Sequence, residues 1–93
     1  MSAPGMLVVG GGGKPLGYQQ LTPSASTGFT VPAGATLAVV TADTATVWWR
    51  DDGTAPTVTV GMPIAVGTYL AFVGNLSTVK FISATGHLNV SYY

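Results

Sequence analysis

The chain has 93 residues, no cysteine and six charged residues, which leave a formal net charge of zero. Charged residues make up 6% of the sequence, whereas an ordinary soluble domain carries about 25%. This composition excludes a disulfide scaffold, and it argues against a nucleic-acid partner, because such a partner is bound by basic patches. The hydrophobic fraction of 47% and the mean hydropathy of +0.48 also argue against a disordered chain. A chain of this length supports one modest core and therefore one domain.

The first sixteen residues differ in composition from the rest. They contain four consecutive glycines at positions 10–13, which have the largest backbone entropy cost on ordering. We therefore predict a flexible arm over residues 1–16 and a folded domain over residues 17–93. The arm carries an apolar segment whose residues are candidate assembly contacts: Met6, Leu7, Val8 and Val9. Two interpretations stay open, a disordered tail and an arm that lies on a neighbouring subunit.

The glycine run lacks the context of a phosphate-binding loop. No Lys-Ser or Lys-Thr follows it, and Pro15 interrupts the helix that such a loop requires. The start of the chain also has no basic region typical of a signal peptide, and no apolar run approaches the roughly 20 residues that span a membrane. We expect neither a signal peptide nor a membrane segment.

From Tyr18 onward, short apolar runs alternate with glycine and proline, and threonine and valine are abundant. This composition favours strands over helices. In chain order, the predicted strands cover residues 18–21, 28–31, 35–42, 46–50, 57–60, 62–65, 68–73, 76–83 and 87–92. This spacing with tight turns predicts an all-β fold, a small antiparallel β-sandwich of about eight short strands, either jelly-roll or immunoglobulin-like.

Turn residues and side-chain alternation add detail to this prediction. Residues 32–34 (Pro-Ala-Gly) suit a turn with glycine at the positive-φ position. Residues 51–53 (Asp-Asp-Gly) are a strong signal for a hairpin turn. The strand expected after this hairpin alternates so that Val58 and Val60 point inward, and Pro63 marks the next strand as an edge piece.

The densest cluster of distinctive side chains lies just before this predicted hairpin. Trp48 and Trp49 point to opposite faces of their strand, so we expect one of them in the core. Arg50, Asp51 and Asp52 together hold half of the charged residues. Two roles stay open for them, a local ion pair that pins the turn and an Arg–carboxylate contact between subunits. Trp49 and these three charged residues are therefore further candidate assembly contacts.

Enzymatic and metal chemistry are poorly supported. The only histidine is His87, and a Ser-His-Asp arrangement would need an aspartate and a serine beside it, without any nucleophile motif to mark them. Zinc lacks ligands in a chain with one histidine and no cysteine, and Asp51 and Asp52 could supply only some of the oxygens that calcium needs. We expect no catalytic activity, no metal and no cofactor. Aromatic and amide side chains that could meet a sugar are Trp49, Tyr69, Tyr92, Tyr93, Gln19 and Asn89.

Four stretches of the sequence together resemble small structural proteins encoded in tailed-phage genomes. They are residues 29–35 (FTVPAGA), 48–57 (WWRDDGTAPT), 61–64 (GMPI) and 89–93 (NVSYY). The resemblance covers roughly residues 18–93. Some of these structural proteins resemble the capsid decoration or cement proteins on the outside of phage heads. The resemblance implies a cysteine-free β-sandwich with a structural role in the virion, and it brings no catalytic residues.

This resemblance and the shortage of charge lead to the same expectation. A net charge near zero promotes association, and proteins repeated around a shell meet at symmetry axes. We expect a non-enzymatic virion protein, made in the host cytoplasm and located on the capsid surface, that bridges subunits of the major capsid protein. Its expected partners are that coat protein and copies of itself, as a dimer or trimer, with no nucleic acid and no membrane. The alternative is a carbohydrate-binding or adhesion β module of a phage tail or fibre.

Overall fold

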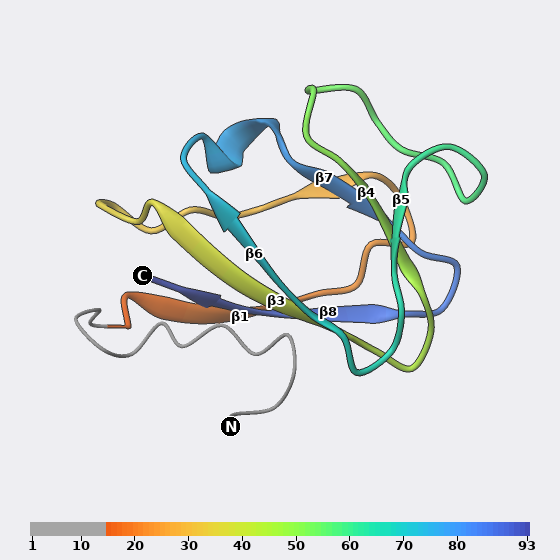
Figure 1. Ribbon diagram of the computed structural model, residues 1–93, viewed down its shortest axis with the longest axis horizontal. Coiled ribbons are helices and arrows are strands. Elements are labelled where there is room, and N and C mark those ends of the chain that lie inside the picture. Colours follow the sequence, from red (N-terminus) through yellow and green to blue (C-terminus); the bar gives the residue numbers. More distant parts are fainter. Residues whose placement is uncertain (1–14) are drawn as a thin grey trace.

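The computed structural model describes residues 15–93, which form a two-layered β structure (Figure 1). Its strands are β1 (Gly17–Leu21), β2 (Thr27–Gly28), β3 (Leu37–Asp43), β4 (Val47–Arg50), β5 (Met62–Ile64), β6 (Tyr69–Val73), β7 (Lys80–Ile82) and β8 (His87–Tyr92). One sheet has the order β1-β8-β3-β6 and the other the order β2-β7-β4-β5, and all these neighbours pair antiparallel. The predicted antiparallel β-sandwich of about eight short strands is confirmed.

Most predicted strands coincide with observed ones, and three do not. The strand predicted over residues 28–31 is a two-residue strand, β2, that ends at Gly28. Residues 57–60 form bends and turns rather than a strand. The strand predicted over residues 76–83 is divided into a 3-10 turn, η1 (Leu76–Thr78), and the short strand β7. The turn predicted over residues 32–34 is confirmed, because Ala35 N–H donates to Pro32 C=O at 3.1 Å and Gly34 has a φ of 83°.

The hairpin signal at residues 51–53 corresponds to a longer connection than a turn. β4 does pair with the next strand along the chain, β5, but a loop over residues 51–61 joins them. Within this loop the Thr57 hydroxyl accepts the Val60 N–H at 2.9 Å, and the backbones of these two residues also bond to each other. Such local bonds compete with a strand ladder. Val58 and Val60 are consequently about half exposed, at 50% and 52%, and do not point inward.

A side-chain cap explains why the strand predicted over 76–83 begins late. The Asn75 carboxamide oxygen accepts the Ser77 N–H at 3.3 Å and the Ser77 hydroxyl at 2.6 Å. The Thr78 hydroxyl donates to the Asn75 carbonyl at 3.2 Å. These bonds satisfy the backbone in a turn, as asparagine and serine often do at such positions.

The core lies between the two sheets and is built from alternate positions of the strands. Its buried residues are Leu21, Ala38, Val40, Ala42, Val47, Ile64, Phe72, Leu76, Val79, Phe81, Leu88, Val90 and Tyr92. Phe29, Phe72, Phe81 and Trp49 meet edge to face, with ring centroids 4.9–5.7 Å apart in neighbouring pairs. The candidate contacts Met6, Leu7, Val8 and Val9 lie outside the described residues, so the arm stays a prediction.

Candidate functional site

One candidate surface is the outward side of the β1-β8-β3-β6 sheet. Inward positions of its strands fill the core, so the alternating positions between them face away from the second sheet. We call this surface the outer face. Its residues are Tyr18, Gln20, Leu37, Val39, Thr41, Asp43, Tyr69, Ala71, Val73, His87, Asn89 and Ser91.

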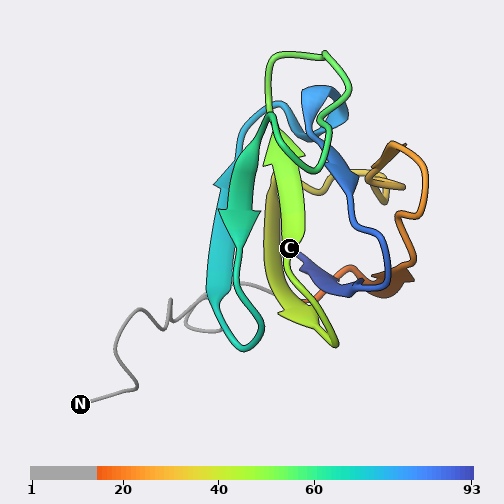
Figure 2. The same ribbon diagram turned by 90° about the vertical axis from the view of Figure 1, so that its right-hand side faces the viewer.

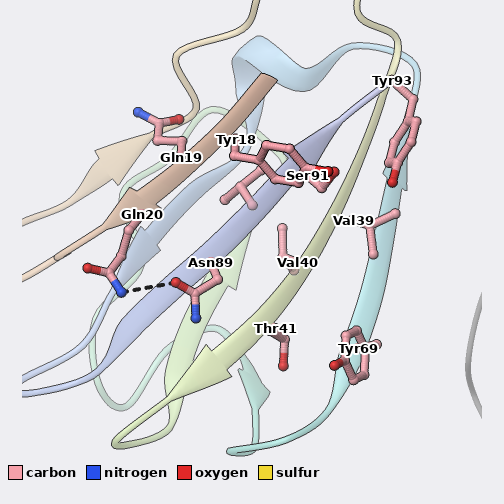
Figure 3. A pocket seen from close by; sticks show the side chains of 11 residues that line it. Tyr18, Gln19, Gln20, Val39, Val40, Thr41, Tyr69, Asn89, Ser91 and Tyr93 are labelled. Atoms are coloured by element: carbon pink, nitrogen blue, oxygen red, sulfur yellow. Dashed lines mark hydrogen bonds between the residues drawn. The ribbon is translucent and has the colours of Figure 1, made fainter. Parts of the chain in front are cut away.

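An open groove of about 590 Å³ runs across the outer face. Tyr18 and Tyr69 come from the two edge strands of this sheet, β1 and β6, and Asn89 and Thr41 come from the strands between them, β8 and β3 (Figure 3). Tyr93 also lines it, next to the end of β8. The groove therefore has aromatic sides and a floor that carries amide and hydroxyl groups.

Polar groups in the groove are held by the pairing of β1 with β8. Gln20 lies opposite Asn89, and its amide nitrogen donates to the Asn89 carboxamide oxygen at 3.0 Å (Figure 3). Tyr18 lies opposite Ser91 in the same ladder. Within residues 15–93, the buried Ser91 hydroxyl oxygen has no hydrogen-bond partner. A buried hydroxyl normally bonds to protein or to water, so the groove floor contains one unused polar group.

No charged side chain lines this groove among the described residues. The aspartate and the histidine of the outer face lie at its end, where Asp43 is opposite His87 in the β3–β8 ladder. His87 Nδ1 is 3.2 Å from the Thr22 hydroxyl oxygen, in an exposed contact. The structure thus brings the single histidine near an aspartate and a threonine rather than a serine.

The charged cluster of β4 forms a local ion pair. Arg50 donates to both carboxylate oxygens of Asp52, from Nη2 at 2.5 Å and from Nε at 3.2 Å, and it is the single ion pair among residues 15–93. Asp52 also accepts the Thr54 N–H at 3.1 Å. The hydrogen bonds from Arg50 and Thr54 lower the pKa of Asp52, and the bond to Asp52 raises the pKa of Arg50. Asp51 is exposed, and a contact between subunits stays a prediction for this cluster.

The two tryptophans divide as expected. Trp49 packs against the core, with its ring 4.9 Å from that of Phe72. Trp48 is half-buried on the opposite side of the β2-β7-β4-β5 sheet, where it lies between Ile82 and Pro63. Trp49 is therefore a partly buried residue at the edge of the core. Together with Arg50 and Asp52 it also lines a second, open hollow on the surface.

The residues considered for sugar contact fall into two groups. Tyr69, Tyr93, Asn89 and Gln19 line the groove, whereas Trp49 and Tyr92 do not. Tyr92 does not stack on a ligand, because it is 1% exposed, and burial raises its pKa. Its hydroxyl donates to Gln19 at 2.5 Å, and Gln19 in turn accepts the Thr30 N–H.

Sequence reasoning did not find Tyr18, Thr41 or Ser91. The alternation of β1 contained a signal for Tyr18, because a buried Leu21 turns Tyr18 outward. The pairing of β1 with β8, which brings Tyr18 across from Ser91, joins residues near the two ends of the domain. No local pattern predicts that pairing.

Comparisons with protein-family models, with curated proteins and with solved structures find no match to this chain. Within residues 15–93, no helix is long and apolar enough to cross a membrane. In the same part of the chain, no three His, Cys, Asp or Glu side chains gather as a metal-binding group.

Proposed function

We propose that this chain is a non-enzymatic structural protein of a tailed-phage particle, most similar in role to a head decoration protein. It would bridge subunits of the major capsid protein through uncharged surfaces, and it would lie on the capsid surface after synthesis in the host cytoplasm. The sequence resemblance to phage structural proteins is one support for this proposal. The observation that carries it is the large amount of exposed apolar surface in a domain with few charges.

The exposed apolar residues are concentrated in one part of the chain. Among residues 15–93, nine large hydrophobic residues are exposed, and six of them belong to residues 58–73: Val58, Val60, Met62, Val66, Tyr69 and Val73. No charged residue stands between Asp52 and Lys80 in the sequence. Exposed apolar residues without charges among them are typical of surfaces that bind other proteins, and permanent interfaces are more apolar than transient ones. An assembly role explains this surface directly.

The composition of the particle tests this proposal. We expect mass spectrometry of purified particles, from the phage whose genome encodes the chain, to detect it in the head fraction after heads and tails are separated. Heads prepared without the chain should release DNA at a lower temperature, and adding the purified chain should restore the original temperature. Particles that lack the chain would overturn the proposal. Its presence in the tail fraction alone would replace the head role by a tail role.

A second candidate function is the binding of a neutral carbohydrate in the groove of the outer face. The specific observation is that Tyr18 and Tyr69 flank hydroxyl and amide groups in a groove without lining charge. Binding pockets commonly combine aromatic walls with a few placed polar groups, and tyrosine offers both an apolar ring and a hydroxyl. This function would fit an adhesion module of a phage tail or fibre.

A glycan array tests this second candidate. If a neutral glycan binds, Tyr69→Ala should weaken its binding by about two- to tenfold, because contact with an aromatic ring contributes on the order of 0.5–1.5 kcal/mol. Trp49→Phe, which changes an aromatic residue outside the groove, is the matched control and should leave binding unchanged. An array without hits, or equal losses for both variants, would exclude the groove as a carbohydrate site.

A further inference from the structure

The sandwich has four edge strands, and three of them are poorly suited to pairing with another chain. β2 has only two residues, and β5 has three with Pro63 at its centre. β1 is contacted by Thr30, whose N–H and hydroxyl both bond to the Gln19 side chain. Short strands, proline and covering segments are the usual means by which proteins protect sheet edges.

β6 has none of these protections. It is five residues long and contains neither proline nor a charged residue, and β3 is its single neighbour among the described strands. The Gly74 N–H donates to the Thr36 carbonyl at 2.9 Å on the side of β3. Because antiparallel ladders alternate, the N–H and C=O groups of Tyr69, Ala71 and Val73 then point away from β3. The edge therefore presents a row of backbone groups ready for another strand.

The surroundings of this edge are apolar. β6 and β5 are edges of different sheets, and a turn over residues 65–68 joins them on the same side of the sandwich (Figure 2). Val73 is 77% exposed and Met62 is 57% exposed. This side of the molecule belongs to the uncharged part of the chain between Asp52 and Lys80. Exposing this apolar surface to water is unfavourable, so its burial by a protein partner is favoured.

The side chains of β6 are complementary to themselves. If two copies of Tyr69–Val73 pair antiparallel about their centre, Ala71 meets the partner's Ala71 and Tyr69 meets the partner's Val73. This register places small residues at the two-fold axis and an aromatic residue against a β-branched one on each side of it. Cross-strand pairs of the second kind stabilise antiparallel sheets. A two-fold interface requires this self-complementarity, whereas a foreign strand does not.

We propose that β6 is a homodimer interface, at which a second copy of this chain extends the β1-β8-β3-β6 sheet into one continuous sheet of eight strands. The two outer faces then lie side by side, and each dimer presents two grooves in one surface. This inference deepens the proposed assembly role by naming a partner and a contact. It rests on the edge and its side chains, so it holds for either candidate function.

Cysteine pairing tests the register, because the chain has no cysteine of its own. We expect Ala71→Cys to form a covalent dimer under a short thiol-to-thiol crosslinker, since paired residues lie about 5.5 Å apart between Cα atoms. Tyr69→Cys and Val73→Cys should each crosslink poorly alone and efficiently as a mixture. Gln20→Cys, on β1 at the far edge of the sheet, is the control and should not crosslink.

Light scattering gives an independent test that does not require crosslinking. The wild-type chain should have twice its monomer mass of 9.4 kDa. Val73→Lys should raise the dimer Kd by about tenfold or more, because a lysine on the edge opposes strand pairing. Gln20→Lys adds the same charge on β1 and should leave the dimer intact. Since Val73 is exposed, its substitution should not prevent folding, which circular dichroism would verify.

Several outcomes would overturn the dimer. A mass of one chain at all concentrations would do so, as would a dimer that Val73→Lys leaves unchanged. A dimer that is lost when residues 1–13 are deleted, while β6 variants have no effect, would assign the contact to the arm instead. Crosslinking of Ala71→Cys to a coat subunit alone would assign β6 to that protein. The mass and crosslinking measurements need only the purified chain. A negative result for the dimer is therefore distinct from a negative result for the virion role, which is tested on purified particles.

Discussion

Replacing Phe81 by alanine is expected to lower the free energy of unfolding by about 3–5 kcal/mol. Phe81 is completely buried at the centre of β7, and its ring meets those of Phe29 and Phe72 edge to face at 4.9 Å and 5.7 Å. The substitution removes the ring from both contacts and leaves a cavity between the sheets. Domains of this size are stabilised by only about 5–14 kcal/mol, so the loss is a large fraction of the total.

Urea denaturation at one fixed protein concentration measures this loss, with tryptophan fluorescence as the signal, to which the core-packed Trp49 contributes. Phe81→Leu should cost clearly less than Phe81→Ala, because it retains most of the buried volume. Val58→Ala, at an exposed position in the loop over residues 51–61, is the surface control and should stay within about 0.5 kcal/mol of the wild type. Equal losses for Phe81→Ala and Val58→Ala would contradict the placement of Phe81 at the centre of the core.

The features of the fold that sequence reasoning predicted well are those with strict two-residue alternation. In β8, Leu88, Val90 and Tyr92 are buried, and the residues between them face outward, as the pattern indicates. Because one face of each strand must meet the core, the hydrophobic pattern fixes which side points inward. Proline at position 63 likewise identified β5 as an edge strand.

The errors arose where short polar side chains bond to nearby backbone. The residues over 57–60 alternate as a strand would, but the Thr57 hydroxyl closes a turn with Val60. Asn75 similarly caps η1, at the start of a segment for which the sequence predicts a strand. Both errors follow from one cause, since threonine and asparagine offer the backbone a local partner in place of a ladder.

The candidate site was predictable as single residues but not as a surface. Tyr69, Tyr93 and Asn89 were identified by chemical type, while their common groove depends on the order β1-β8-β3-β6. This order pairs Tyr18 with Ser91, which are far apart in the sequence. Strand spacing carries no information on such pairing, because it reflects the packing of the whole chain.

Gly86→Ala is expected to lower the free energy of unfolding by about 2–4 kcal/mol, combining overpacking with damage to buried hydrogen bonds. Gly86 is buried in the turn that joins β7 to β8, and its N–H donates to the Ser83 hydroxyl oxygen at 2.9 Å. The same hydroxyl donates to the Thr46 carbonyl at 2.7 Å. A Cβ on residue 86 would lie 2.6 Å from the Ala45 carbonyl oxygen and 2.6 Å from the Ser83 oxygen. Backbone on one side and a bonded hydroxyl on the other leave no room for it.

Gly17→Ala is the matched control for this substitution, because its Cβ would meet Pro32 at an ordinary 3.5 Å. It should change the free energy of unfolding by less than about 1 kcal/mol. Ser83→Ala separates the two causes, since it relieves one close contact but leaves the buried Gly86 N–H without its acceptor, at a cost of about 1–3 kcal/mol. The double variant of Gly86→Ala and Ser83→Ala should therefore lose less than the sum of the single losses. Strict additivity would mean that the turn does not act as one packed and hydrogen-bonded unit.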